Sequence, residues 1–562
     1  GWNDLYDYMM ANDLTVQANY DYVATQLDIN SFIDYFIINT YLVNTDWLNW
    51  NTKWWRGNAD PVVRFKYTLW DMDNVINLGE NYTGLPGTGY EVDPCAVEDL
   101  FTGNPNVPHV DMFNALFENE DFFALYLNRY LDLLNTTFHK DFMIPHLEDM
   151  AADLAPEMPQ QVARWGGSIA EWEDHIDEMK TFLENRYDLI IELIQDCNED
   201  EITGIYTLTA NVNNPNGGDI RVNTVIPETY PWTGTYFGGV GLTLTAIPQE
   251  GWVFDRWEIT GGGTLTSTTD EQTNLSLTGD AAVEAVFIQE RQITFIVEPP
   301  LAGEISINGS VPVAFPFTQT FLNGTNVNLS AILDERFEMV NWVSLNHSLS
   351  PSDTDIDINF TVTQDDDTIT LNLSRIILPF KCSVEPEGAG ILDVNGIIPA
   401  VYPYETEFKH SVPVNVLATP NAKYVFEYWT SEGNVLSPDN FSQAVSFNIK
   451  TGENMVAHFR KLHDLTVVVS PEGAGSVRVD EIVYDTFPVT QEILDETTIY
   501  LSAYPVPEYE FVRWTLSNHL VDPKAVSQDV SLTVNESDVL VANFKLKEVE
   551  IFIPASFTPN ND

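Results

Sequence analysis

The sequence predicts a multidomain protein, with a mainly helical (α+β) region up to about residue 200 followed by four tandem all-β modules. Three observations lead to this prediction. Apolar residues at helical spacing dominate before residue 200. Short β-branched and aromatic segments, broken by Gly, Pro, Asn and Asp, dominate after it. An aromatic motif ending in tryptophan then returns every 85 to 87 residues, which is the signature of a repeat.

The first region contains three segments with helical periodicity, at residues 31–45, 111–138 and 168–195. Ser168 and Glu171 have the spacing of a capping box, so we expect the third helix to begin there. The stretch between the first two segments is rich in loops, and residues 62–70 form its clearest strand candidate.

Charge limits the classes of partner. The chain carries 84 acidic and 25 basic residues, for a formal net charge of -59. Such a chain repels nucleic acid and anionic membranes, and we expect it to bind neither. No run of 18 or more apolar residues occurs, so no transmembrane segment is expected. Hydrophobic residues make up 44% of the chain, which predicts packed cores rather than disorder.

Three cysteines are present, Cys95, Cys197 and Cys382, and no C-x-x-C pair. A thiolate zinc site is therefore not expected. Cys95 and Cys197 lie in the same predicted region and are able to form one disulfide, a point the sequence leaves open. So few cysteines fit either a secreted bacterial protein or a reducing cytosol.

The repeat is defined by segments such as "GWVFDRW" and "KYVFEYW", which end in Trp257, Trp342, Trp429 and Trp514. We expect these tryptophans to be core anchors. The expected modules are residues 203–290 (module 1), 291–377 (module 2), 378–462 (module 3) and 463–547 (module 4). Each has enough residues for one core, so each is expected to fold alone. The G-x-x-F-x-x-W motif with a final A-x-F resembles the divergent bacterial surface repeats related to the internalin B-repeat.

The tail "VEIFIPASFTPNND", within residues 548–562, resembles the start of the C-terminal sorting domain of the type IX secretion system, in its gliding-motility-associated form. This resemblance implies a secreted or cell-surface bacterial protein that is attached to the surface through that domain.

Candidate chemistry lies in residues 46–79. Asp46 and Asn51 have the D-x-x-x-x-N spacing of a kinase catalytic loop, and the predicted strand is followed by Asp71 and Asp73. Carboxylate and amide oxygens suit Mg²⁺. Phosphoryl transfer needs little beyond the metal, the phosphates and the acceptor held in line. We therefore expect Asp46, Asn51 and Asp71 to converge, with Asp73 close by.

The segments "INTYLVNTDWLNWN" and "WDMDNVINLG", followed by "RW" at 164–165 and "FLENRYDLI" at 181–189, resemble the spore-coat CotH family of atypical protein kinases over residues 1–197. The resemblance implies a kinase-like C-terminal lobe that uses ATP with Mg²⁺ or Mn²⁺. By position, Asp46 would be the catalytic-loop Asp and Asn51 a metal ligand. Asp71 would be the main metal ligand with Asp73 beside it, although the choice between these two stays open.

Two further features surround this segment. Lys53 and Arg56 are the basic residues of the 46–61 stretch, and they either contact phosphate or offset the local acid. Four tryptophans cluster there, at positions 47, 50, 54 and 55, and most are expected to pack. About 30 residues without Lys or Arg precede the first core helix, so we expect this sequence to lack the nucleotide-gripping lobe of a complete kinase.

The sequence thus favours a secreted or cell-surface CotH-like kinase that phosphorylates Ser or Thr of extracellular proteins and is carried on a β-repeat stalk. The alternative is a non-catalytic surface or adhesion protein with an inactive CotH-like domain. Motifs for other chemistries, such as G-x-S-x-G, H-E-x-x-H and the P-loop, are missing from the sequence.

Overall fold

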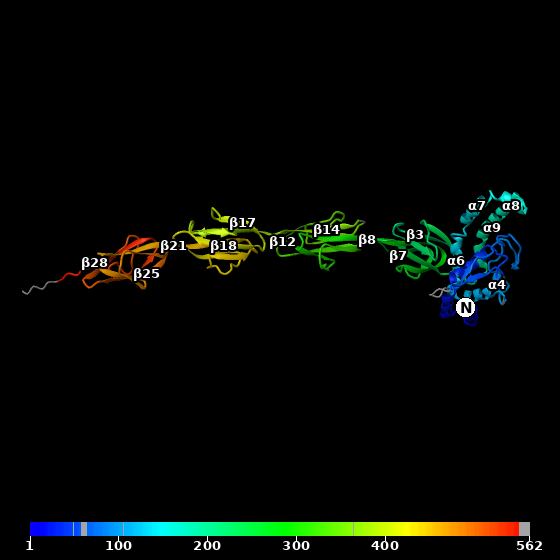
Figure 1. The fold of residues 1–562 in the computed structure, drawn as a ribbon, viewed down its shortest axis with the longest axis horizontal. Helices are drawn as coiled ribbons and strands as arrows, with labels where there is room; N and C mark the ends of the chain where they lie inside the picture. Colours follow the sequence, from blue (N-terminus) through cyan, green and yellow to red (C-terminus); the bar gives the residue numbers. More distant parts are fainter. Residues whose placement is uncertain (49, 58–63, 105, 364, 550–562) are drawn as a thin grey trace, which may run out of the picture. The chain divides into compact units, whose positions relative to one another are not determined.

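The computed structural model describes residues 1–48, 50–57, 64–104, 106–363 and 365–549. The chain is multidomain, with a helical region followed by a large all-β region in several sheets, as Figure 1 shows. It divides into two compact units. One holds residues 1–292 with 319–325 and 361–366, and the other holds the remainder.

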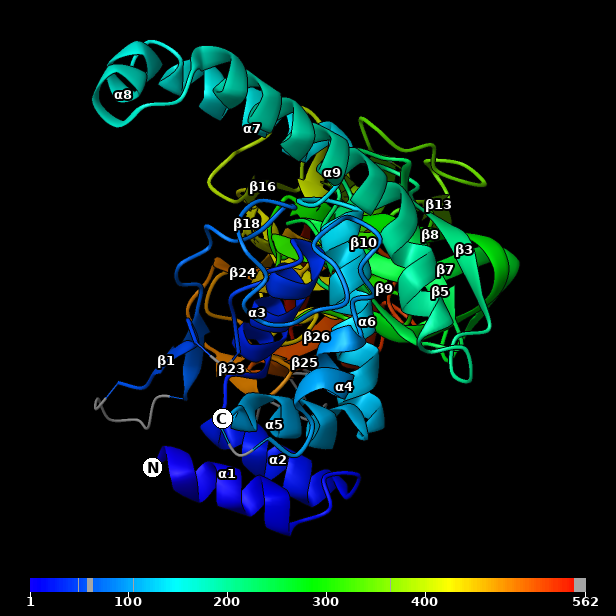
Figure 2. The same ribbon diagram turned by 90° about the vertical axis from the view of Figure 1, so that its right-hand side faces the viewer.

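The helical region contains helices α1 to α9 and one short hairpin. The helices are α1 (Trp2–Ala11), α2 (Gln17–Gln26), α3 (Ile29–Tyr41), α4 (Ala96–Phe101), α5 (Pro108–Phe117), α6 (Glu120–Leu134), α7 (Lys140–Leu154), α8 (Met158–Trp165) and α9 (Ile169–Asp196). The hairpin strands are β1 (Lys53–Trp55) and β2 (Lys66–Thr68), which pair antiparallel. In Figure 2, α7 lies alongside α9 and α8 sits at their far end.

The helices follow the predicted periodicity with local differences. The segment predicted at 31–45 is helical only as far as Tyr41, where α3 ends. The segment predicted at 111–138 is two helices, because Asn119 interrupts it and its side chain caps α6 by accepting the backbone N–H groups of Asp121 and Phe122. Ser168 caps α9 as expected, since its hydroxyl accepts the N–H of Glu171 at 3.1 Å. The strand predicted at 62–70 is shorter, and residues 62 and 63 lie outside the described part of the chain.

Module 1 packs onto the helical region through a buried carboxylate on α6. Asp132, which is 1% exposed, accepts the backbone N–H of Thr224 at 2.9 Å and the hydroxyl of Tyr236 at 2.8 Å. Asn135 exchanges two hydrogen bonds with the backbone of Thr235. One continuous hydrophobic core runs from the helices into module 1. The helical region and module 1 are therefore packed as one body. This differs from the expectation that module 1, like the other modules, folds alone.

The strands of modules 2, 3 and 4 are divided between two sheets, whereas all the strands of module 1 belong to one sheet. Module 1 contains β3 (Gly204–Val212), β4 (Gly218–Val222), β5 (Trp232–Gly238), β6 (Leu242–Pro248), β7 (Trp252–Leu265) and β8 (Gln272–Glu298). Module 2 contains the end of β8, which pairs with β14, together with β9 (Gly303–Ile307), β10 (Phe317–Leu322), β11 (Asn326–Leu333), β12 (Phe337–Val343), β13 (Asp357–Thr361) and β14 (Asp367–Arg375).

Module 3 contains β15 (Ile377–Glu385), β16 (Gly390–Val394), β17 (Tyr404–Lys409), β18 (Pro413–Pro420), β19 (Tyr424–Ser431), β20 (Ala444–Asn448) and the start of β21 (Glu453–Ser470). Module 4 contains the rest of β21, then β22 (Gly475–Val479), β23 (Ile482–Tyr484), β24 (Val489–Leu494), β25 (Thr497–Pro505), β26 (Tyr509–Thr515), β27 (Asp529–Val534) and β28 (Asp538–Leu546). The boundaries expected near residues 290 and 462 fall inside the long strands β8 and β21.

The repeated tryptophan is the core anchor of every module, as the sequence predicts. All four side chains are at most 2% exposed. Each indole N–H donates to a backbone carbonyl 13 residues later, at 2.9–3.1 Å. Trp429 and Trp514 lie in separate cores. The indole thus fills the sandwich and ties down the loop that follows its strand.

Candidate functional site

The segment after α3 carries the predicted catalytic residue, and buried amides hold that segment in place. The Asn44 amide donates to Asn39 Oδ1 at 2.8 Å, and Asn44 Oδ1 accepts the backbone N–H of Asp46 at 2.9 Å. Both asparagines are 1% exposed. Because a buried amide must find partners, these bonds fix the backbone that presents Asp46.

Thr45 joins this segment to the loops that follow β2. Its backbone N–H donates to Asn74 O at 2.9 Å. Its own carbonyl accepts the N–H groups of Tyr82 and Thr83, at 2.8 and 2.7 Å. These hydrogen bonds hold residues 74–83 against the residues around Asp46, although the two stretches lie up to 38 positions apart.

Asp46 and Asn51 are in direct contact. The Asn51 amide donates to both Asp46 Oδ2 and the Asp46 carbonyl at 3.0 Å. Burial, the nearby charge of Asp71 and then that of Asp73 raise the pKa of Asp46, and the hydrogen bond from Asn51 only partly opposes this. The structure thus brings all four predicted acid and amide residues into one neighbourhood.

The backbone here takes unusual conformations. Left-handed φ values occur at non-glycine residues throughout this part of the chain: Val43 (51°), Leu48 (66°), Asn51 (27°), Asp71 (55°), Ile76 (59°) and Asn77 (59°). Such conformations cost about 1–3 kcal/mol each and persist where surrounding contacts enforce them. At Val43 and Ile76 the cost is greatest, because a β-branched side chain fits this region worst. The contacts around this loop therefore hold its backbone in one defined shape.

The two basic candidates lie in different places. Lys53, on β1, sits over the ring of Trp70 at 5.8 Å from its centroid, directly beside Asp71 in the chain. Arg56 instead donates to Gln26 Oε1 at 3.5 Å and lies over the ring of Phe65. Lys53 thus contacts the residue that precedes Asp71, whereas Arg56 is turned toward α2.

The tryptophans divide into packing and exposed residues. Trp47 is buried against Tyr35 and Phe36, and Trp54 contacts Trp2. Trp50 and Trp55 are 69% and 53% exposed, and Trp54 is 37% exposed despite its contact with Trp2. The expectation that most of the four pack is therefore wrong, since Trp47 is the one that is buried.

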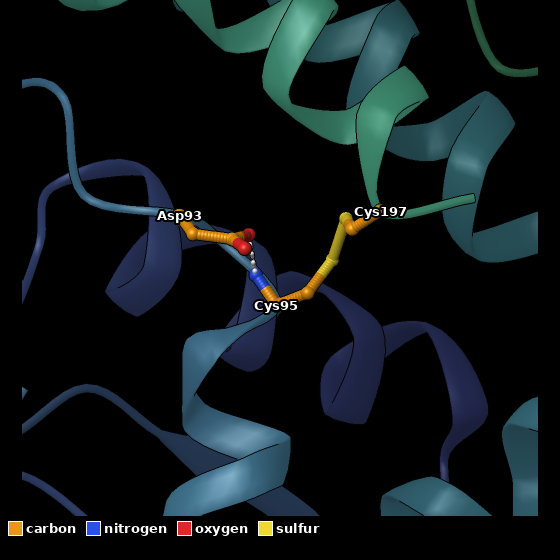
Figure 3. Close-up of side chains that lie close together, drawn as sticks. All are labelled: Asp93, Cys95 and Cys197. Carbon is orange, nitrogen blue, oxygen red and sulfur yellow. Dashed lines mark hydrogen bonds between the residues drawn. A yellow bond between two sulfur atoms is a disulfide. The ribbon is translucent and has the colours of Figure 1, made fainter. Parts of the chain in front are cut away.

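The carboxylate and amide oxygens of the four candidate residues suit a hard divalent cation. The three carboxylates, however, do not all lie within 4.8 Å of one another. In the described part of the chain, one group of three acidic, His or Cys ligand atoms lies mutually within 4.8 Å: Asp93, Cys95 and Cys197. Its two sulfurs are joined in a disulfide, so thiolates are not available to a metal there (Figure 3). Asp46, Asp71 and Asp73 are spaced more widely, and a cation bound there would need water or phosphate oxygens to complete its shell.

Arg186 of α9 binds the backbone at the end of α3, which leads into the site, and sequence reasoning did not single it out. Its guanidinium is fully buried and donates to four backbone carbonyls at 2.5–3.0 Å, those of Thr40, Tyr41, Tyr90 and Val92. Two of these carbonyls end α3, the helix that leads into Asp46. An arginine on the apolar face of a long helix is the signal that identifies such a residue.

Comparison with known families gives two matches. The family described as "CotH kinase protein" matches residues 2–190. The family described as "Divergent InlB B-repeat domain" matches residues 208–291, 401–462 and 465–548. Most of module 2 lies between the first two of these repeat matches. No curated protein matches the chain.

Similar solved structures include the Bacillus anthracis TIE protein, with 9% identity and a TM-score of 0.24 over 61% of this chain and 68% of the other. The open conformation of the pilus adhesin SpaC from Lactobacillus rhamnosus GG gives 10% identity and a TM-score of 0.20, over 67% and 60%. These likenesses are too low to support a statement about this protein. The family matches do support one: the chain contains a CotH domain over residues 2–190 and divergent InlB B-repeat domains within residues 208–548.

Proposed function

We propose that the CotH domain binds ATP with Mg²⁺ or Mn²⁺ and transfers a phosphoryl group to Ser or Thr of an extracellular or cell-surface protein. The observation that carries this proposal is the contact between Asp46 and Asn51, beside two further carboxylates that raise the pKa of Asp46. Like charges gathered in this way are unfavourable unless a cation is bound, so the arrangement favours function over packing.

Each residue has a distinct role in this proposal. Asp46 accepts a hydrogen bond from the acceptor hydroxyl and takes its proton, for which a raised pKa is suited. Asn51 and Asp71 supply metal ligands, with Asp73 as an additional one. Mg²⁺ held there would offset the charge on the phosphates. Lys53 reaches phosphate from β1, whereas Arg56 would first have to leave Gln26 and Phe65.

The remaining features support a surface location. The disulfide between Cys95 and Cys197 is typical of proteins that fold in an oxidising compartment. A CotH domain joined to B-repeat domains suggests a surface or spore-coat-like protein. None of the helices that the structure describes is long and apolar enough to cross a membrane. Attachment through a type IX sorting domain is also part of the proposal. It is supported by the sequence of the tail, because residues 550–562 lie outside the described residues.

The test is phosphoryl transfer by the full protein from labelled ATP with Mg²⁺ or Mn²⁺, to itself and to extracellular proteins. Asp46→Asn and Asp71→Asn are expected to abolish transfer. Asp149→Asn, an exposed acid on α7, is the matched control and is expected to leave it unchanged. Calorimetric titration with Mn²⁺ in parallel distinguishes failure of phosphoryl transfer alone from failure of metal binding. Metal binding without transfer would favour the non-catalytic surface protein, and loss of both would overturn the metal site itself.

A further inference from the structure

Asn44 lies where helix α3 ends and the candidate site begins. Its backbone N–H donates to Asn39 O at 2.9 Å, and the intervening Val43 has a left-handed φ of 51°. With Leu42 as the C-cap of α3, this matches the Schellman motif, in which the second residue beyond the cap bonds to a carbonyl of the last turn. The motif holds Asn44 against the last turn of α3, where the residue is 1% exposed.

The side chain of Asn44 contacts both of the stretches that carry the candidate residues. Its Oδ1 accepts the backbone N–H of Asp46 at 2.9 Å, which is the bond of an Asx-turn. Its Nδ2 lies 3.5 Å from Sδ of Met72, the residue between Asp71 and Asp73. Asp46 and Met72 are 26 positions apart in the chain. One small, buried side chain therefore joins the two stretches.

A third contact fixes the orientation of the Asn44 amide. Nδ2 also donates to Asn39 Oδ1 at 2.8 Å, and Asn39 donates to Tyr35 O at 2.8 Å within α3. Both donor positions and the oxygen of Asn44 are thus engaged. An aspartate at this position would lose both donors and add a buried charge beside the other carboxylates, so the amide is the group that fits.

Backbone hydrogen bonds extend the junction between the two stretches on the far side of Met72. Leu42 O accepts the N–H of Ile76 at 2.9 Å, and the N–H of Thr45 donates to Asn74 O at 2.9 Å. These bonds hold the chain from residue 74 onward. The contact between Asn44 and Met72 lies closer to the acids, between Asp71 and Asp73 themselves.

We propose that Asn44 is a positioning residue of the candidate metal site, which sets the separation between Asp46 and the Asp71–Asp73 pair. Its oxygen holds the backbone of Asp46, and its amide holds Met72. The inference rests on the proposed function, because a cation shared by the two stretches requires them at a defined separation. Without this link, repulsion among the three carboxylates would favour a wider separation whenever no cation is bound.

Calorimetric titration of the full protein with Mn²⁺ tests this role. Asn44→Leu retains a side chain of similar size and removes all three contacts, and we expect about tenfold weaker binding. Asn44→Ser keeps an oxygen that is able to accept the N–H of Asp46 but is too short to reach Met72, and we expect about threefold weaker binding. Circular dichroism shows whether each variant is folded.

Asn128→Leu is the matched control. Asn128 is 6% exposed, lies on α6 and donates to Gly241 O at 2.8 Å, so the variant also removes a buried amide. We expect it to lower the thermal unfolding temperature and leave the affinity for Mn²⁺ unchanged. A residue with a merely structural role would behave like this control. Unchanged affinity in Asn44→Leu, or an equal loss in Asn128→Leu, would overturn the inference and leave the proposed function standing.

Hydrogen exchange without metal provides a second measurement. In Asn44→Leu we expect faster exchange both at residues 45–48 and at residues 71–76, because the link between them is lost. Absence of Mn²⁺ binding by the unaltered protein would refute the metal site and with it the proposed function. Exchange at residues 71–76 would then still decide whether Asn44 holds the two stretches together, and unchanged exchange there would overturn that link.

Discussion

At the scale of single residues, the site depends on groups whose partners are far away in the sequence. Arg186 and the carbonyl of Thr40 are 146 positions apart, and Asp46 is 25 positions from Asp71. The D-x-x-x-x-N spacing made Asp46 and Asn51 candidates, because two residues of one loop are close in sequence as well as in space. Nothing in local sequence identifies the carbonyls that Arg186 binds, since every residue has a carbonyl.

Arg186→Met should destabilise the helical region by about 3–5 kcal/mol, because four buried carbonyls lose their donors at once. Urea unfolding followed by circular dichroism measures the change. Arg164→Met removes an exposed arginine on α8 and should alter stability by no more than about 0.5 kcal/mol. An effect of Arg186→Met as small as that of the control would show that the buried guanidinium is not a structural tie.

The raised pKa of Asp46 predicts a pH dependence of metal binding. A cation requires the ionised carboxylate, and an isolated Asp ionises with a pKa of about 3.9. Because burial and the charges of Asp71 and Asp73 raise the pKa of Asp46, affinity for Mn²⁺ should begin to fall at a higher pH as the solution is acidified. Calorimetric titration across mildly acidic pH tests this. In Asp73→Asn the fall should move to lower pH, and an unchanged profile would contradict the assignment.

At the scale of elements, the repeated strand that ends in tryptophan behaves alike in all modules. A register shift in the pairing occurs just before each tryptophan, for example between Phe426 and Tyr428. Bulges of this kind redirect the next side chain, here into the core. The sequence predicted the burial of the tryptophan from its period. It did not predict the hydrogen bond to the carbonyl 13 residues later, because that loop has a different sequence in every module.

Trp429→Ala should destabilise module 3 by about 3–5 kcal/mol, since it removes a large buried side chain and leaves the carbonyl of Ser442 without its donor. Phe441→Ala is the control in the same module, where the ring is 69% exposed, and should cost much less. Differential scanning calorimetry of the full chain reports both. A loss below about 1 kcal/mol for Trp429→Ala would show that the indole does not hold the core.

At the scale of the whole chain, tertiary contacts decide which segments form one body. Equal module lengths predict that module 1 resembles the others, yet it shares a core with the helices and buries Asp132. Burial raises the pKa of Asp132, although the hydrogen bonds from Thr224 and Tyr236 oppose the shift. A carboxyl whose pKa is raised by folding favours the folded state most when protonated, so its contribution weakens as pH rises through the folded pKa.

Asp132→Ala should loosen module 1 from α6, because the backbone and hydroxyl of Thr224 and the hydroxyl of Tyr236 all lose their acceptor. Hydrogen exchange on the full chain should then be faster in both α6 and β5. Asp188→Ala removes an exposed partner of Lys140 and should leave exchange in these elements unchanged. Faster exchange confined to α6 would indicate that the two parts are not coupled through Asp132.

The sequence alone determined the helical and all-β division, the repeat period, the buried tryptophans and the start of α9, because periodicity and capping are local properties of the chain. It also identified Asp46, Asn51, Asp71 and Asp73 as candidates. Only the tertiary structure decided that Asn51 contacts Asp46, that Arg56 turns toward Gln26, and that module 1 shares a core with the helices. Those facts depend on contacts between distant segments, whose free energy is set by the packed fold and not by any one stretch of residues.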